Sequence, residues 1–320
     1  MTRRPLIAAL GAALVMALGA CGLESSSGHF VSAESADGQK PLAGATISVT
    51  SKSFSEGVLL GKITTTMLQA SGADITDITN APGSMSSRQA MVSGAADVSW
   101  EYTGTIWVSY LKQTETISDS TELFTRVRDA ERRNGIEVLT PAPFNNTYAF
   151  AVTPQQKAQL NLRTLSDLFR LPPQQRSLCV DPEFQSRPDG LPRLLQKYEV
   201  RLGTATPANT VNTMDAGVVY SAISGGTCLA GDVYATDGRI RKMGLELLED
   251  DRKFFLPYDG VPEVRTDALA KYPALTEVLG KVSRLLTNET MQELNGQIDI
   301  EGRDPADVAA TWLKKVGLVR

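Results

Sequence analysis

Strand-like and helix-like stretches alternate in the N-terminal part of the chain, and this alternation constrains the fold more than any other sequence feature. Residues 45–50 alternate polar and apolar side chains, as a short half-buried strand does. Residues 55–71 carry apolar side chains at helical spacing, and residues 73–81 again resemble a strand. A short helix at residues 87–93 and a strand that contains Asp97 complete the pattern. Strands that alternate with helices predict an α/β sheet, which binds ligands at the carboxyl ends of its strands.

The same alternation begins again in the second half of the chain. Residues 178–180 are strand-like, and so is the stretch that ends at Val233. Residues 191–198 and 216–224 have helical patterns. Residues 140–152 (TPAPFNNTYAFAV) pass from a turn into an extended apolar run, as a strand that crosses between domains would. We therefore expect two similar α/β lobes with a crossover strand between them.

The C-terminal part of the chain is expected to be mostly helical. Residues 268–286 form a long amphipathic pattern with Pro273 near a helix start. Thr287 predicts the cap of a short helix that ends at residues 295–296. Asp304 and Pro305 are the N-cap and first-turn signals of a last helix. The acidic residues in this region lack the spacing of a calcium-binding loop, so we expect no metal site.

The N-terminus has the features of a bacterial lipoprotein signal peptide. An apolar run at residues 6–18 follows two arginines and is too short to span a bilayer. Small residues before Cys21 resemble a lipobox, in which the cysteine becomes the lipidated N-terminus of the mature protein. We expect residues 1–20 to be removed and Cys21 to anchor the protein to the outer face of the cell membrane. Residues 21–43 would form a flexible tether; secretion with an incidental cysteine is the alternative.

Charge and histidine content exclude several classes of function. The chain has 36 acidic and 32 basic residues, whereas a nucleic-acid-binding protein presents a strongly basic face. Its one histidine, His29, lies in the expected tether, so the folded part has no imidazole for catalysis or metal binding. The GxSxG and SxxK motifs of hydrolases are also missing from the sequence, so we expect neither enzymatic activity nor a bound cofactor.

Two cysteines remain after Cys21, and their spacing limits what they can do. Cys179 and Cys228 are too far apart in the sequence for a CxxC or zinc motif. Outside the cytoplasm such a pair is expected to form a disulfide. Two buried free thiols are the alternative.

Four of the eight tyrosines lie in turn-like contexts rather than in helical patterns. They are Tyr102 in EYTGT, Tyr148 in NNTYAF, Tyr234 in VYATDG and Tyr258 in FFLPYDGVP. The other four, Tyr110, Tyr198, Tyr220 and Tyr272, lie in helix-like patterns that packing explains. If the four turn tyrosines converge, their negative ring faces can hold a quaternary ammonium group, which has no N–H to donate.

Several motifs resemble, in their order along the chain, those of one protein family. They are SKSFSEG (Ser51–Gly57), SSRQAMVSGAADVSWEYTGT (Ser86–Thr105), NNTYAFAV (Asn145–Val152), FQSRPDGLP (Phe184–Pro192), MDAGVVYSAISGG (Met214–Gly226), VYATDGRI (Val233–Ile240) and FFLPYDGVP. The chain resembles the substrate-binding lipoproteins of osmoprotectant ABC importers, which take up solutes of the glycine betaine, choline or proline type. The resemblance covers residues 44–316, essentially the whole mature domain.

This resemblance implies a two-lobed α/β fold of the type II periplasmic-binding-protein class. The ligand cleft would lie between the lobes, and two crossover strands would form the hinge. Residues 44–145 and 238–320 are expected to form lobe 1, and residues 146–237 lobe 2. The implied function is to capture a quaternary ammonium osmolyte and deliver it to the permease and ATPase subunits of the importer. We expect the binding protein itself to be a monomer.

The resemblance also implies the site residues. The four turn tyrosines match the positions that form the family's aromatic box. Lys52, Thr105 and Arg187 match positions that hold the ligand carboxylate, and a guanidinium group can hold a carboxylate through two parallel hydrogen bonds. Asn146 and Glu183 lie beside matched positions and are expected to line the cleft.

Some positions depart from the family pattern and leave the identity of the ligand open. Gly57 replaces a bulkier polar residue, Trp100 is unusual before EYTGT, and the pair Cys179 and Cys228 is not general in the family. One alternative is the same fold with an aromatic, polyol or amino-acid solute. The alternative from a different functional class is an extracytoplasmic enzyme.

Overall fold

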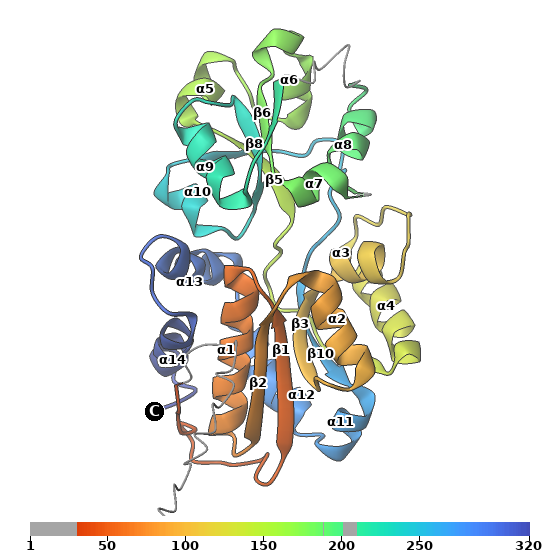
Figure 1. Ribbon diagram of the computed structural model, residues 1–320, viewed down its shortest axis with the longest axis vertical. Coiled ribbons are helices and arrows are strands. Elements are labelled where there is room, and N and C mark those ends of the chain that lie inside the picture. The colour runs from red at the N-terminus through yellow and green to blue at the C-terminus, as the bar shows by residue number, and fades with distance from the viewer. Residues whose placement is uncertain (1–30, 188, 201–209) are drawn as a thin grey trace, which may run out of the picture.

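The computed structural model describes residues 31–187, 189–200 and 210–320 of the chain. The expected signal peptide, Cys21 and the first part of the tether lie outside these residues. The described residues form two α/β lobes that are stacked along the long axis of the molecule (Figure 1). None of the helices in this part of the chain is both long and apolar enough to cross a membrane.

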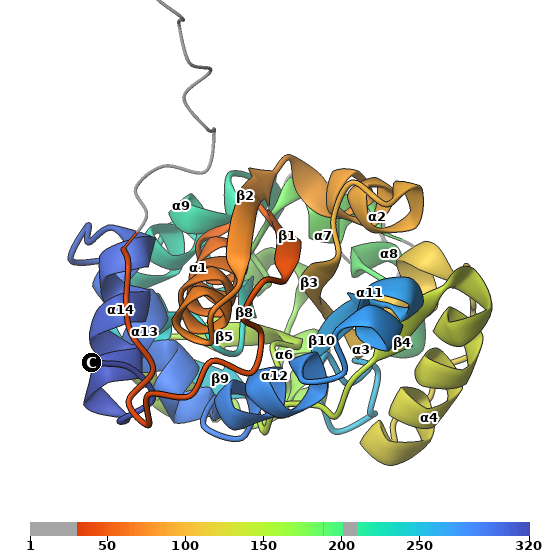
Figure 2. The same ribbon diagram turned by 90° about the horizontal axis from the view of Figure 1, so that it is seen from below.

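Lobe 1 contains a five-stranded sheet in the order β2-β1-β3-β10-β4. Its strands are β1 (Thr46–Lys52), β2 (Asp74–Ala81), β3 (Val98–Tyr102), β4 (Ile136–Val138) and β10 (Gly260–Arg265). Its helices are α1 (Ser55–Ala70), α2 (Gly83–Ser93), α3 (Thr103–Thr105), the π-helix η1 (Ile106–Tyr110), α4 (Ser120–Glu131), the 3-10 turn η2 (Arg132–Asn134), α11 (Thr266–Lys271), α12 (Leu275–Ser283), α13 (Asn288–Asp299) and α14 (Pro305–Lys315). Helices α1, α13 and α14 lie side by side (Figure 2).

Lobe 2 contains a second five-stranded sheet in the order β7-β6-β8-β5-β9. Its strands are β5 (Tyr148–Val152), β6 (Leu178–Val180), β7 (Val211–Thr213), β8 (Ala230–Tyr234) and β9 (Glu246–Leu248). Its helices are α5 (Pro154–Gln159), α6 (Leu165–Arg170), the 3-10 turn η3 (Pro173–Gln175), α7 (Pro182–Ser186), α8 (Leu191–Lys197), α9 (Ala216–Ser224) and α10 (Gly238–Lys242).

In each sheet, the strand that runs antiparallel to its neighbours belongs to a segment that crosses between the lobes. β5 is antiparallel to β8 and β9, and β10 is antiparallel to β3 and β4. The two crossing segments are hydrogen-bonded to each other. The Asn146 N–H donates to the Tyr258 carbonyl at 3.0 Å, and the Tyr258 N–H donates to Oδ1 of Asn145 at 2.9 Å. The expected two-lobed α/β fold with two crossover strands is confirmed.

The long pattern at residues 268–286 is divided into α11 and α12, and Pro273, which was expected near a helix start, lies two residues before α12. One helical prediction for the C-terminal part differs from the structure. Helix α13 continues past Gly296, where we expected it to end. A Cβ atom on Gly238 would lie 2.5 Å from the Cα of Gly296, so these glycines allow α10 and α13 to approach closely.

The strands β9 and β10 were not recognised in the sequence, and they change the division between the lobes. β9 is hydrogen-bonded to β5 in lobe 2, so lobe 2 extends beyond the boundary expected at residues 237–238. β10 occupies a central position in the sheet of lobe 1 and contains Pro262, which lies opposite Trp100. Because proline is rare in central strands, its presence hid this strand in the sequence.

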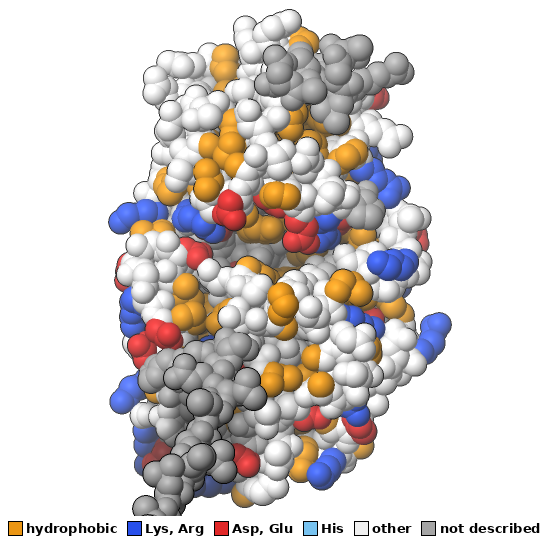
Figure 3. Space-filling model, viewed as in Figure 1, with side chains coloured by type: hydrophobic (Ala, Val, Ile, Leu, Met, Phe, Trp, Pro, Cys, Tyr) orange, Lys and Arg blue, Asp and Glu red, His pale blue; other side chains and the backbone are white. Residues whose placement is uncertain are grey.

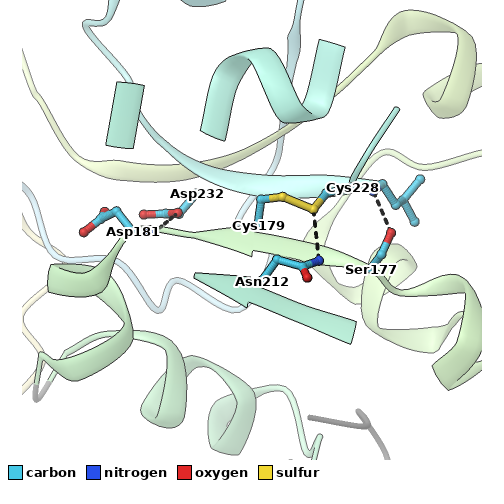
Figure 4. The surroundings of a disulfide bond; sticks show 7 residues. Ser177, Cys179, Asp181, Asn212, Cys228 and Asp232 are labelled. Atoms are coloured by element: carbon cyan, nitrogen blue, oxygen red, sulfur yellow. Dashed lines mark hydrogen bonds between the residues drawn. A yellow bond between two sulfur atoms is a disulfide. The ribbon is translucent and has the colours of Figure 1, made fainter. Parts of the chain in front are cut away.

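A disulfide between Cys179 and Cys228 joins β6 to the segment that leads into β8 (Figure 4). Both cysteines are fully buried, and their Cα atoms are 5.8 Å apart. The Asn212 side chain of β7 donates to Sγ of Cys228 at 3.5 Å, which connects the bridge to the next strand. The alternative of two free thiols is therefore not what the structure contains.

Replacing both cysteines by alanine should lower the stability of the protein by about 2–4 kcal/mol, because the bridge closes a segment of 49 residues in the unfolded chain. Thermal unfolding followed by circular dichroism measures this change. Adding a reductant to the wild type should lower its melting temperature, and adding it to the double variant should not. Equal melting temperatures for the oxidised wild type and the double variant would contradict the prediction.

Candidate functional site

A cavity of about 170 Å³ lies between the two lobes, and we call it the interlobe cavity. It is lined by Lys52, Ser53, Phe54, Gly83, Ser84, Tyr102, Thr105, Asn146, Tyr148, Glu183, Arg187, Tyr234 and Tyr258. These include all nine residues that the sequence analysis selected. The cavity is smaller than the sites of drug-sized ligands, about 300–1,000 Å³, so it suits a small solute. Charged side chains gather along the hollow between the lobes (Figure 3).

Three of the four selected tyrosines have their rings close together in this cavity. Tyr148 and Tyr234 lie opposite each other in the ladder of β5 and β8, and their ring centroids are 5.1 Å apart. Tyr258, from the second crossing segment, stands at 88° to the Tyr148 ring at a centroid distance of 5.9 Å. Burial raises the pKa of all three hydroxyls well above the ordinary value of 10.0, so the rings are neutral. The group presents aromatic surface without a phenolate charge.

The glycine of the EYTGT motif makes room for one of these rings. A Cβ atom on Gly104 would lie 2.8 Å from the ring carbons of Tyr258, closer than atoms can approach. The tight turn from β3 into α3 therefore allows Tyr258 to pack against backbone. This contact explains why the EYTGT motif has a glycine at position 104, which the sequence indicated only through the family resemblance.

Tyr102 lines the cavity from lobe 1 and has different surroundings. Its hydroxyl donates to Oε1 of Glu56 at 2.6 Å, and its ring lies 6.2 Å from the ring of Phe54. The ammonium group of Lys52 lies 4.3 Å from the centroid of the Tyr102 ring. One cation of the protein itself therefore already contacts Tyr102 in the manner expected for a ligand cation.

Lys52 forms a buried ion pair beneath the cavity. Its Nζ donates to Oε1 of Glu101 at 2.5 Å, and both side chains are almost completely buried. The second oxygen of Glu101 accepts a hydrogen bond from the Tyr110 hydroxyl. A buried lysine without a partner would be costly, so Glu101 makes the charged form of Lys52 tolerable here. Glu101 was not predicted from the sequence as a site residue, although it stands in the EYTGT motif.

Arg187 is held in place by several hydrogen bonds from its guanidinium group. Nε and Nη2 donate to the two carboxylate oxygens of Asp189 at 2.9 and 3.0 Å. Nη2 also donates to the Tyr258 hydroxyl at 2.8 Å, and Nη1 donates to Glu183 at 3.0 Å. The paired edge that could hold a ligand carboxylate is thus occupied by Asp189 in this structure. The Glu183 side chain on Nη1 is 57% exposed, so water competes for this hydrogen bond more than for the bonds to Asp189, which is 17% exposed.

Thr105 and Asn146 add two uncharged polar side chains to the lining of the cavity. Thr105 ends the short helix α3 and is buried against the cavity. Asn146 donates through Nδ2 to Glu56 at 2.9 Å, while its Oδ1 has no hydrogen-bond partner among the described residues.

Some lining residues were missed, and the other tyrosines lie elsewhere. Ser53 and Phe54 belong to the SKSF motif but were not selected, and Gly83 and Ser84 at the start of α2 carry no motif signal. None of the four tyrosines assigned to packing lines the interlobe cavity. Across the ranges that the structure describes, no cluster of three or more His, Cys, Asp or Glu side chains could hold a metal ion.

A group of buried carboxylates lies next to the Lys52–Glu101 pair. Glu263 of β10 is almost fully buried, and burial, with the nearby charges of Glu101 and Glu131, raises its pKa from 4.5 to about 8. Arg88 forms an ion pair with Glu131 at 2.7 Å and is 3.8 Å from Glu263. The raised pKa favours the protonated form of Glu263 at neutral pH, which lessens the negative charge next to the Lys52–Glu101 pair.

Residues 45–315 match the family of substrate-binding domains of ABC-type glycine betaine transport systems. The chain belongs to this family. One relative is a glycine-betaine-binding protein of Pseudomonas aeruginosa, 35% identical over 278 residues that cover 84% of this chain and 88% of that protein. Another is the glycine betaine-binding protein YehZ of Escherichia coli, 30% identical over 86% of this chain and 92% of the relative. These family members are transport binding proteins rather than enzymes.

Solved structures of the family have the same fold. A crystal structure of a glycine betaine/carnitine/choline ABC transporter has a TM-score of 0.73 with 28% identity, over 84% of this chain and 98% of that chain. Unliganded YehZ from Escherichia coli has a TM-score of 0.69 with 29% identity, over 86% and 100% of the two chains. The resemblance that the motifs indicated is confirmed.

Replacing Glu263 by glutamine should change how stability depends on pH. Because the pKa of about 8 in the folded protein exceeds 4.5, the folded state keeps a proton that the unfolded chain releases. The contribution of this group to the free energy of unfolding is therefore largest below about pH 4.5 and falls as the pH rises to about 8. Between pH 5.5 and 8.5 the free energy of unfolding should fall less in Glu263→Gln than in the wild type. The difference between the two falls should exceed about 1.4 kcal/mol, the value of one pKa unit.

Urea unfolding at a series of pH values measures this difference. The matched control is Glu277→Gln, because the Glu277 side chain is 77% exposed and its removal should leave the pH dependence unchanged. Parallel stability curves for the wild type and Glu263→Gln would contradict the prediction.

Proposed function

We propose that this protein is the extracytoplasmic solute-binding component of an ABC importer and captures a quaternary ammonium osmolyte of the glycine betaine or choline type. The observation that carries the proposal is the group of neutral rings of Tyr148, Tyr234 and Tyr258 in a small interlobe cavity. A methylated ammonium group cannot be held by hydrogen bonds, whereas each ring face contributes about 0.5–2 kcal/mol to holding it. The relatives that bind glycine betaine support the same conclusion.

The ligand carboxylate, where there is one, would lie toward the basic side of the cavity. Lys52 retains donor capacity beyond its bond to Glu101, Thr105 has a hydroxyl, and Arg187 offers Nη1. Lys52 and Arg187 line the cavity together with the carboxylate of Glu183, and each of the two cations is paired with a carboxylate behind it, Glu101 or Asp189. A betaine would use these polar groups as well as the rings, whereas choline has no carboxylate to place there. A carnitine transport binding protein of Listeria monocytogenes, 30% identical over 76% of this chain, is consistent with a zwitterionic ligand.

The two-lobed arrangement suggests how binding leads to transport. Lys52, Tyr102 and Thr105 belong to lobe 1, whereas Glu183 and Arg187 belong to lobe 2. A solute that contacts both groups stabilises the closed arrangement of the lobes, and a permease can then recognise that arrangement. ATP would be hydrolysed by a separate subunit. The binding protein would act as a monomer that is anchored to the membrane through a lipid on Cys21.

Replacing Tyr234 by alanine should weaken binding of choline and glycine betaine at least tenfold, because one ring face of the cage is lost. Isothermal titration calorimetry measures the change. Tyr234→Phe keeps the ring and should bind more tightly than the alanine variant. Tyr272→Ala removes a ring outside the cavity and should leave the affinity unchanged. Full affinity in Tyr234→Ala would rule out a cation held by this ring.

Replacing Arg187 by alanine should reduce affinity for glycine betaine more than affinity for choline, which has no carboxylate. Both ligands will lose some affinity, because Arg187 also positions Tyr258 through a hydrogen bond at 2.8 Å. The informative quantity is therefore the ratio of the two losses, and we expect it to be about tenfold, as for one charge-assisted hydrogen bond. Equal losses for the two ligands would show that Arg187 does not contact the carboxylate.

A further inference from the structure

Glu56 is a buried carboxylate that is bonded to two residues of the cavity lining, Tyr102 and Asn146. It lies in the first turn of α1, next to the interlobe cavity, and is only 3% exposed. Its four described partners are neutral donors: Tyr102 at 2.6 Å and Asn146 at 2.9 Å on Oε1, and Thr236 at 2.6 Å and Asn295 at 2.7 Å on Oε2. A buried carboxylate without a cation is costly unless its oxygens are well supplied with donors.

These donors come from separate parts of the molecule. Tyr102 ends β3, and Asn295 lies in α13, so both belong to lobe 1. Thr236 lies in lobe 2, in the turn after β8, and Asn146 lies in the crossing segment before β5. One carboxylate therefore joins both lobes and a segment of the hinge.

Three of the four donors to Glu56 are cavity tyrosines or lie close to one in the sequence. We call Glu56 and its four donors the Glu56 junction. Thr236 is two residues from Tyr234, and Asn146 is two residues from Tyr148. Tyr102 is itself a cavity tyrosine and is held through its hydroxyl. One of the four tyrosines thus binds Glu56 directly, and two others lie two residues from one of its donors.

Helix α13 holds the same turn of lobe 2 by additional bonds. Asn295 donates to the carbonyl of Thr236 at 3.0 Å, and Gln292 donates to the carbonyl of Ala235 at 2.9 Å. The close approach of Gly238 to Gly296 allows α10 and α13 to pack beside this turn. The hydroxyl of Thr236 thus reaches Glu56 across a junction that is already closely packed.

We propose that Glu56 is a positioning residue that sets the relative positions of the tyrosines from the two lobes and thereby the affinity for the ligand. It does not contact the ligand; it acts through Tyr102, Thr236 and Asn146. The effect on affinity rests on the function proposed above, whereas the coupling of the two lobes through one carboxylate does not. The two parts can therefore be tested separately.

The first experiment measures coupling without any ligand. Thr236→Val removes the hydroxyl from lobe 2, and Tyr102→Phe removes the hydroxyl from lobe 1. Both hydroxyls donate to the carboxylate of Glu56, and water replaces the first donor that is removed. The melting temperature of the double variant should therefore fall by less than the sum of the falls in the two single variants. The matched control is Thr213→Val, whose hydroxyl donates to Gln185 within lobe 2; its effect should add to that of Tyr102→Phe. Additive losses for Thr236→Val and Tyr102→Phe would overturn the proposal.

The second experiment measures affinity for choline and glycine betaine by calorimetry. Thr236→Val should weaken both ligands by a similar factor of about tenfold, because the lost bond to a charged group touches neither ligand. Thr236→Ser restores the hydroxyl and should restore affinity, which a general loss of packing would not allow. Unchanged affinity in Thr236→Val would overturn the positioning role. If the wild type binds neither ligand, the proposed function fails, while the first experiment still tests the junction.

Discussion

The hydrogen bonds between the two crossing segments are the constraint on which the site depends. The Asn146 N–H binds the Tyr258 carbonyl, and the Tyr258 N–H binds the side chain of Asn145. This pairing brings Tyr258 beside Tyr148, which stands at the start of β5. The ladder of β5 and β8 then sets Tyr234 opposite Tyr148. Three rings from distant parts of the sequence are thus brought together by backbone geometry before any contact between side chains is considered.

The charged groups of the site follow a common rule, which is that each buried charge has its compensating partners close by. Lys52 is paired with Glu101, and Arg187 is paired with Asp189. Glu56 has four neutral donors instead of a cation. Because the desolvation of an unpaired charge costs several kcal/mol, these partners are required for the cations to line a small cavity at all. The tyrosine group therefore depends on carboxylates that do not themselves line the interlobe cavity.

The two-lobed α/β fold was predicted from the sequence, and the nine selected residues all line the interlobe cavity, but the groups that hold them were not predicted. Strand-helix alternation is a local pattern, and the motifs were recognisable as short segments. The partners of Glu56, Glu101 and Asp189 depend on contacts between residues far apart in the sequence or on side-chain direction, which periodicity does not report. The central strand β10 was hidden because Pro262 is unusual there. Gly296 looked like a helix end, although it serves a contact with Gly238 in the other lobe.

The division of the cavity lining between the lobes bears on how much energy a ligand must supply. To move an equilibrium between open and closed lobes from 1:99 to 99:1, a ligand must favour the closed form by about 5.5 kcal/mol. One ring contributes about 0.5–2 kcal/mol, so no single tyrosine is sufficient. Several rings together with the cations of both lobes can reach this value only if they contact the ligand at the same time. A site built from one lobe could bind the solute, but it would not couple binding to closure. The hydrogen bonds to Glu56 help to meet this requirement, because they keep tyrosines from both lobes within reach of one small molecule.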